Sequence, residues 1–124
     1  MKILLVDDSG TMRKIQKRLL IDAGYSTDDI LEAGNGKEAI QMLEDLKYEC
    51  DLVLCDVNMP EMNGLETLTA IRAKTKAVPV IMCTSVAEKG TVMESIKLGA
   101  NNYLVKPFAQ DNFISKIKAV IEKK

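Results

Sequence analysis

The sequence predicts an α/β fold, a single doubly wound domain in which five parallel strands are covered by five helices on both faces. Short apolar runs alternate with amphipathic segments along the whole chain, which is typical of consecutive β–α units. The clearest run, Leu52–Cys55, is apolar at every position, as expected for a strand buried on both faces. A length of 124 residues leaves room for one such domain and no second unit.

The three N-terminal units are each opened by an apolar run. Their strands are expected at Ile3–Val6, at Ile30–Ala33, where the signal is weaker, and at Leu52–Cys55. After each strand, apolar residues recur every three or four positions, which indicates a helix that packs one face on a sheet. The recurring residues are Met12, Ile15 and Leu19, then Ala39, Ile40 and Leu43, then Leu65, Leu68 and Ile71. Gly24 is expected to cap the first of these helices, because glycine favours that position.

The two C-terminal units follow the same pattern. Their strands are expected at Val78–Cys83 and Tyr103–Val105, and the fourth helix is marked by Val92 and Ile96. Gly90 falls within that helix, where a glycine weakens it by about 1 kcal/mol relative to alanine. The last helix has the clearest apolar face, which consists of Phe113, Ile114, Ile117, Val120 and Ile121.

Composition narrows the classes of function. The net charge of −1 gives no strong attraction to nucleic acid or to an anionic membrane. No stretch approaches the ~20 apolar residues of a membrane span, and the opening apolar run is shorter than the about 7–15 residues of a signal peptide. The three cysteines are odd in number, so we expect buried free thiols in a reducing cytoplasm: Cys50, Cys55 and Cys83. The absence of histidine excludes a histidine base, a histidine zinc site and a phosphohistidine donor within this chain.

Polar residues gather where the predicted strands end, which in a doubly wound sheet is where functional residues lie. They are Asp7 and Asp8 after the first strand, Asp56 after the third, Thr84 and Ser85 after the fourth, and Lys106 after the fifth. Two carboxylates ~4 Å apart repel by about 4 kcal/mol at an effective dielectric of 20, so three of them need cations. Lys106 supplies one positive charge. An all-oxygen ligand set favours Mg²⁺ or Mn²⁺ for the rest.

Four motifs in order resemble those of response-regulator receiver domains, and the likeness spans the whole chain. They are "VDD" at 6–8, "CDVNMP" at 55–60, "CTS" at 83–85 and "YLVKPF" at 103–108. The resemblance implies a flavodoxin-like sheet of order 2-1-3-4-5 and one receiver domain over residues 1–124 without an effector domain. Receiver domains are themselves a standard example of the strand-end rule.

The resemblance also implies roles for individual residues. Asp56 would accept a phosphoryl group from a partner histidine kinase, with Thr84, Lys106 and Ser85 contacting that group. Mg²⁺, or Mn²⁺, would be held by Asp7, Asp8, Asp56 and the backbone carbonyl of Asn58. Thr84 and Tyr103 would form the switch, and the Lys106–Pro107 peptide bond would be cis. Such a protein is a phosphoacceptor that assists its own phosphorylation and dephosphorylation, rather than an enzyme.

The implied partners are a histidine kinase, a phosphorylation-dependent output protein and a phosphatase. The likeness is strongest to stand-alone regulators of chemotaxis, so the implied output is the flagellar motor switch and the implied state is a cytoplasmic monomer. A stand-alone receiver in another signalling phosphorelay remains the alternative.

Each site residue also has a plainer interpretation. Asp8 with Ser9 would serve as a helix N-cap, and Asp56 would open a turn. Thr84 and Ser85 are common loop residues, Lys106 would be a solvated lysine, and Tyr103 a half-buried strand aromatic.

Two other classes of function fit part of the sequence. "GNGKEA" at 34–39 satisfies the G-x-G-x-x-A outline of a dinucleotide-binding turn, with Asp56 about 20 residues later. That interpretation leaves the residues at the other strand ends without a role. A magnesium-dependent phosphohydrolase acting through an aspartyl-phosphate would share Asp56, but would want a second acid in place of Asn58 and a cap over the substrate.

Overall fold

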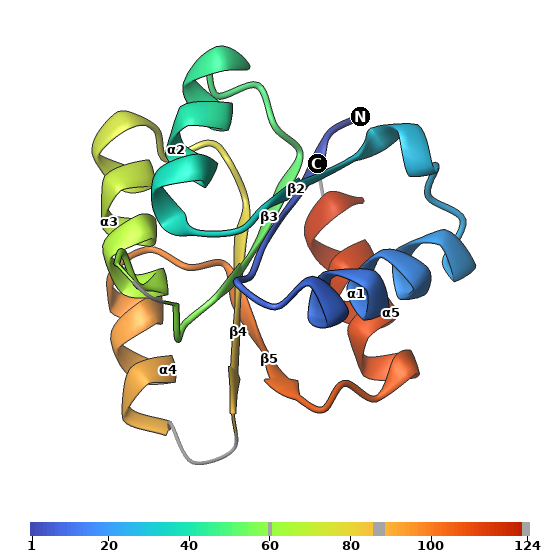
Figure 1. The fold of residues 1–124 in the computed structure, drawn as a ribbon. Coiled ribbons are helices and arrows are strands. Elements are labelled where there is room, and N and C mark those ends of the chain that lie inside the picture. The colour runs from blue at the N-terminus through green and yellow to red at the C-terminus, as the bar shows by residue number, and fades with distance from the viewer. Residues whose placement is uncertain (60, 86–88, 123–124) are drawn as a thin grey trace.

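Five parallel strands form one sheet in the order β2-β1-β3-β4-β5, as predicted (Figure 1). A computed structural model describes residues 1–59, 61–85 and 89–122. The strands are β1 (Ile3–Val6), β2 (Ile30–Ala33), β3 (Leu52–Asp56), β4 (Val80–Ser85) and β5 (Asn102–Lys106). Because every strand runs in the same direction, all five carboxyl ends lie at one edge of the sheet.

Helices cover both faces of the sheet, so the predicted doubly wound α/β class is confirmed (Figure 1). On one face lie α1 (Gly10–Asp22) and α5 (Gln110–Ile121). On the other lie α2 (Gly36–Asp45), α3 (Gly64–Lys74) and α4 (Lys89–Lys97). A short 3₁₀ helix, Thr27–Asp29, precedes β2.

The core has two halves separated by the sheet. Successive strand residues point to opposite faces, so Leu4 and Val6 pack with α2 and α3, whereas Ile3 and Leu5 pack with α1 and α5. The strands β1 and β3 are buried at every position. The apolar face predicted for the last helix is confirmed, since α5 buries its residues at 113, 117 and 121 in the second half of the core.

Side-chain caps fix where three helices begin. The hydroxyl of Ser9 accepts a hydrogen bond from the backbone N–H of Met12 at 3.1 Å, and Asn35 caps α2 in the same way. Asn63 and Glu66 form a reciprocal capping box at α3. Gly24 lies one residue beyond the C-cap of α1 with φ +104°, close to its predicted place.

The strand β4 begins and ends two residues later than the sequence predicts. Pro79 has no N–H to donate, and its carbonyl accepts from Val53 before regular pairing starts at Val80. At the other end, Thr84 and Ser85 pair with β5. These two residues are therefore the last of the strand, where the sequence placed them in the loop that follows it.

Two residues expected on buried helix faces are exposed. Ile15 of α1 and Ile96 of α4 are each 45% exposed. The inward positions belong to Gln16 and Ser95, whose polar side chains conceal them from a search for apolar periodicity. The Ser95 hydroxyl is satisfied within its own helix, because it donates to the carbonyl of Val92 at 2.7 Å.

Three further features were expected and are present. The Lys106–Pro107 peptide bond is cis. All three cysteines are buried and none forms a disulfide. Within residues 1–59, 61–85 and 89–122, no helix combines the length and the apolar character that a membrane crossing requires.

Candidate functional site

The register of the sheet brings two acidic residues to the same level on neighbouring strands. Val6 of β1 pairs with Cys55 of β3. The residues that follow these two, Asp7 and Asp56, therefore lie at the same level. The strand order reverses here: β2 lies on one side of β1, whereas β3, β4 and β5 lie on the other side. Both carboxylates are almost completely buried. Two negative charges are therefore held together in a place that water hardly reaches.

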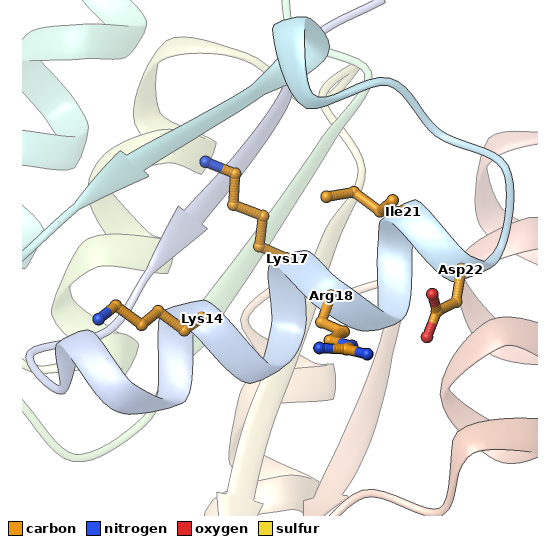
Figure 2. A pocket seen from close by; sticks show the side chains of 5 residues that line it. All are labelled: Lys14, Lys17, Arg18, Ile21 and Asp22. Carbon is orange, nitrogen blue, oxygen red and sulfur yellow. The ribbon is translucent and has the colours of Figure 1, made fainter.

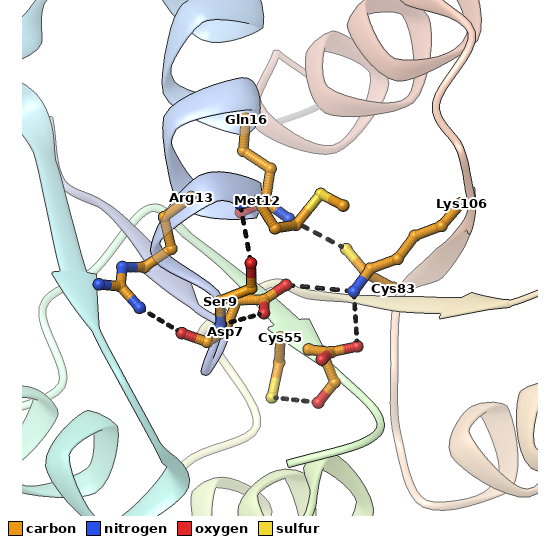
Figure 3. A network of polar contacts seen from close by, with 9 residues as sticks. Asp7, Ser9, Met12, Arg13, Gln16, Cys55, Cys83 and Lys106 are labelled. Carbon is orange, nitrogen blue, oxygen red and sulfur yellow. Dashed lines mark hydrogen bonds and ion pairs between the residues drawn. The ribbon is translucent and has the colours of Figure 1, made fainter.

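The ammonium of Lys106 bridges these two acids (Figure 3). Its Nζ lies 2.9 Å from Oδ1 of Asp56 and 3.1 Å from Oδ2 of Asp7. Lys106 is the last residue of β5, two strands away from Asp56, and its side chain spans that distance along the edge of the sheet. The structure therefore brings together the predicted acidic and basic site residues.

Asp8 completes a cluster of three carboxylates. Asp7, Asp8 and Asp56 each offer an oxygen, and these oxygens all lie within 4.8 Å of one another. Asp8 is exposed, so the cluster opens to solvent on its side. The plainer interpretation, a helix N-cap formed by Asp8 with Ser9, is confirmed for Ser9, whose hydroxyl caps α1. That cap does not involve the carboxylate of Asp8, which belongs to the cluster.

Burial and neighbouring charges set the protonation of the site. Burial raises the pKa of the Asp56 carboxyl above its ordinary value; the hydrogen bond from Lys106 opposes this rise, and the charge of Asp7 adds to it. Burial alone would lower the pKa of Lys106, but Asp56 and Asp7 outweigh burial and the lysine pKa is raised. Lys106 therefore stays protonated, with one ammonium facing two buried carboxylates.

The other predicted residues lie close by. Thr84 is buried in β4, one residue beyond the position that pairs with Asp56. Ser85 pairs with Lys106 through its backbone, and its side chain is outside the described residues. Asn58 is exposed, and its backbone N–H hydrogen-bonds to the carboxylate of Asp56. The use of its carbonyl as a metal ligand stays a prediction.

Tyr103 and Thr84 share a face of the sheet. The residues next to them, Leu104 and Cys83, belong to the half of the core under α1 and α5, so both side chains point toward the opposite face. Tyr103 is half-buried, and the ammonium of Lys116 lies 4.2 Å from the centroid of its ring.

Three residues at the site were not found from the sequence. Arg13 donates from Nη1 to the backbone carbonyl of Asp7 (Figure 3). It also donates from Nε to Glu32 at 3.0 Å. The buried amide of Gln16 faces the thiol of Cys83 at 3.9 Å. Gly64 packs against the backbone of Asp56. Nothing in the local sequence marks these contacts, because each joins residues that are distant along the chain or separated by a loop.

Gly64 is required by the close approach of α3 to the end of β3. A Cβ atom at this position would lie 2.2 Å from the carbonyl oxygen of Asp56 and 2.7 Å from Cα of Val57. Its own N–H donates to the carbonyl of Val57 at 2.8 Å, which closes the loop after β3. Residue 64 therefore helps to fix the backbone that carries the Asp56 carboxylate.

The dinucleotide-like segment has a structural explanation. A Cβ atom on Gly36 would lie 2.2 Å from Oγ1 of Thr67, so this glycine permits close packing of α2 on α3. Asn35 caps α2. The segment follows β2, which is an edge strand and lies away from the reversal point of the sheet. These observations do not favour a cofactor site there.

Comparison with known proteins decides the family. The sequence pattern described as the response regulator receiver domain matches residues 3–118. The chain belongs to that family. As a receiver domain homologous to chemotaxis response regulators, it has the phosphoacceptor role of two-component signalling.

Two chemotaxis proteins are similar to this chain over nearly its whole length. Chemotaxis protein CheY1 of Helicobacter pylori is 43% identical over 123 residues, covering 98% of this chain and 97% of the relative. The chemotaxis protein CheY homolog of Campylobacter jejuni is 44% identical over 126 residues, covering 98% of this chain and 92% of the relative.

Solved structures show the same fold. Vibrio cholerae chemotaxis protein CheY4 superposes with a TM-score of 0.83 at 34% identity, covering 96% of this chain and 97% of the other. The receiver domain of NtrX from Brucella abortus gives a TM-score of 0.89 at 26% identity, covering 99% of this chain and 100% of the other. Both solved structures therefore share the receiver fold of this chain.

Proposed function

We propose that Asp56 is the phosphoacceptor of this receiver domain and that it takes the phosphoryl group from a partner histidine kinase. The observation that carries the proposal is the ammonium of Lys106, which lies 2.9 Å from the carboxylate of Asp56 and 3.1 Å from that of Asp7. A carboxylate oxygen of Asp56 attacks phosphorus, the P–N bond to the kinase histidine breaks, and the bonding electrons return to the imidazole ring. The product is an aspartyl-phosphate.

Lys106 and Thr84 act on the charge of the transferred group. The ammonium lies beside the attacking carboxylate, so it can follow negative charge as this moves from Asp56 to the phosphoryl oxygens. The hydroxyl of Thr84 would donate to one phosphoryl oxygen, and the backbone N–H of Ser85 to another. These groups lie on β4 and β5, which hold them rigidly beside the acceptor.

The carboxylate cluster suits Mg²⁺, with Mn²⁺ as a substitute. Asp7, Asp8 and Asp56 supply hard oxygen ligands within 4.8 Å of one another, and the backbone carbonyl of Asn58 would be the further ligand. One lysine does not balance the acids present, which favours a divalent cation in addition. When bound, Mg²⁺ would neutralise charge on the phosphoryl oxygens.

The phosphodonor is proposed to dock beside the first helix. Lys14, Lys17 and Arg18 project from α1 around a shallow surface hollow that Ile21 and Asp22 also line (Figure 2). The helix begins directly after the Asp7–Asp8 turn, so a kinase domain seated on it would reach the open side of the cluster. The cations would attract an acidic surface of the kinase.

The output is proposed to be read on the face formed by α4, β5 and α5. Phosphorylation would draw Thr84 toward Asp56, and Tyr103 would then move into the space released beside β4. On α4, Met93 is 64% exposed and Ile96 is also exposed, which offers apolar area for a partner. Because the named relatives are chemotaxis proteins, we propose the flagellar motor switch as the output partner, with a phosphatase resetting the system.

The competing function is a phosphohydrolase that turns over phosphate esters through the same aspartate. Asn58 stands where such an enzyme would use a second acid, and its amide cannot exchange a proton as a carboxyl does. A receiver instead accepts one phosphoryl group and helps to add and remove it.

Incubation with Mg²⁺ and acetyl phosphate tests the proposal. Intact-mass spectrometry should show one added phosphate that is lost in base, and Asp56→Asn should abolish it. Asp45→Asn, which alters an exposed acid on α2, is the matched control and should label normally. Full labelling of Asp56→Asn would exclude Asp56 as the acceptor. Steady turnover of a phosphate ester would favour the hydrolase.

A further inference from the structure

One ammonium group makes two contacts with the same residue on the output side of the domain. Nζ of Lys116, on α5, donates to the backbone carbonyl of Tyr103 at 2.7 Å. The same atom lies 4.2 Å from the centroid of the Tyr103 ring, within the range of a cation–π contact. Both residues are partly buried, so neither contact is fully screened by water.

The two contacts depend differently on the position of the ring. The carbonyl belongs to the backbone of β5, so its bond to Lys116 does not require any particular tyrosine rotamer. The contact with the ring exists only while the ring lies beneath the ammonium. The carbonyl bond therefore holds the cation in place, and the ring contact favours one tyrosine rotamer over the others.

We propose that Lys116 is a positioning residue that latches Tyr103 in the unphosphorylated domain. The inference rests on the proposed function, in which Tyr103 changes position after phosphorylation of Asp56. Any rotation of the ring away from the ammonium gives up the cation–π contact, while Lys116 stays bound to the carbonyl. Lys116 therefore raises the phosphorylation-dependent gain in partner affinity by disfavouring the active position at rest.

The expected size of the effect follows from the strength of the contact. A cation–π interaction at a partly exposed site shifts the ratio of two rotamers by about two- to fivefold. A shift of that size adjusts the populations of two states without inverting them. Inverting an equilibrium from 1:99 to 99:1 needs a change of about 10⁴-fold in the equilibrium constant. Lys116 should therefore set the resting population without controlling whether the switch operates.

Three variants separate the latch from general effects of charge. Lys116→Met keeps the length of the side chain and removes the cation. Lys116→Arg keeps a cation that can lie over the ring and should restore the native behaviour. Lys118→Met removes a positive charge from the exposed side of the same helix and is the matched control. Both positions are at least partly exposed on α5, and thermal unfolding monitored by circular dichroism would verify the fold of all three variants.

The side-chain rotamer populations of Tyr103 are measured by NMR with the ring isotopically labelled, in Mg²⁺ alone and in Mg²⁺ with beryllofluoride as a phosphoryl mimic. In Mg²⁺ alone, Lys116→Met should change the rotamer ratio about two- to fivefold, and Lys116→Arg and Lys118→Met should not. Rotamer populations in Lys116→Met equal to those of the wild type would overturn the latch. An unchanged wild-type tyrosine after beryllofluoride would overturn the proposed switch instead, so the two failures are distinguishable.

Discussion

At the scale of single residues, the site is organised around a charge imbalance. Asp7 and Asp56 are buried side by side with one ammonium between them. Repulsion between two carboxylates ~4 Å apart is about 4 kcal/mol at an effective dielectric of 20. Lys106 makes two hydrogen bonds to charged groups, each contributing about 1.5–3 kcal/mol, so together they offset most of this repulsion. Burial, which raises the pKa of the Asp56 carboxyl, still disfavours its charged form in the folded domain.

The first prediction is that Asp56→Asn stabilises the metal-free domain by about 1 kcal/mol at pH 7, because it removes the repulsion while its amide oxygen still accepts from Lys106. A carboxyl whose pKa is raised by folding gives its full stability below the unfolded pKa and loses it as the pH rises through the folded pKa. The advantage of the variant should therefore shrink as the pH falls toward the ordinary pKa of 3.8.

Urea unfolding in EDTA at several pH values would measure this difference. A variant that is less stable than the wild type at pH 7 would show that the Lys106 ion pair outweighs the repulsion between the acids.

The second prediction concerns Gly64. Gly64→Ala should lower the free energy of unfolding by about 1–3 kcal/mol and slow phosphorylation, because the added Cβ would lie 2.2 Å from the carbonyl oxygen of Asp56. Gly90→Ala is the control, since no atom lies within 4 Å of its added Cβ, and it should be neutral or stabilising by up to about 1 kcal/mol. Chemical denaturation and acetyl phosphate labelling measure both effects. Equal stability of the two variants would contradict the close packing.

At the scale of elements, sequence pattern was most informative where it coincided with burial. The strands and α5 could be predicted because their apolar residues are the buried ones. The inward assignments of Ile15 on α1 and Ile96 on α4 were wrong, because the buried positions are held by Gln16 and Ser95. Hydrophobic periodicity cannot detect a polar side chain that finds its partner inside the protein.

In the candidate site, too, some residues could be predicted from the sequence and others could not. Strand ends converge in any parallel sheet, so their acids and lysine could be brought together before the structure was known. The contact of Arg13 with the carbonyl of Asp7, and that of Gly64 with the carbonyl of Asp56, depend on how a helix approaches a particular loop. No periodic signal encodes that distance.

The third prediction tests α1 as the docking element. Lys14→Glu combined with Arg18→Glu should slow phosphotransfer from a phosphorylated histidine kinase about tenfold at low salt, because both cations face solvent beside the site. Labelling by acetyl phosphate needs no protein contact and should be unchanged. Lys74→Glu, at the end of α3, combined with Lys76→Glu, just beyond that helix, is the control for net charge. Equal slowing with both phosphodonors would indicate damage to the site rather than to docking.

At the scale of the whole molecule, metal binding should be coupled to folding. A cation that binds only the native cluster raises the free energy of unfolding by about 2.7 kcal/mol at 100 times its dissociation constant. The cluster is assembled from the ends of β1 and β3, so it exists only when the sheet is formed.

The fourth prediction is that Mg²⁺ raises the melting temperature of the wild type and that EDTA reverses the effect. Asp8→Asn should lose most of this stabilisation, because it removes one of three clustered carboxylates. Asp22→Asn, at the other end of α1, should retain it. Differential scanning calorimetry across a Mg²⁺ titration gives the comparison, and a full Mg²⁺ response in Asp8→Asn would place the ion elsewhere.

The burial of all three cysteines has a practical consequence for following this switch in solution. Burial raises the pKa of Cys83 to about 12 and that of Cys55 well above its ordinary value, so these thiols stay protonated and unreactive toward maleimides. A cysteine introduced at Met93, which is 64% exposed on α4, would then be the favoured point of attachment for a fluorescent dye. The proposed output face could thus be observed in an otherwise native chain, without first replacing the residues of its core.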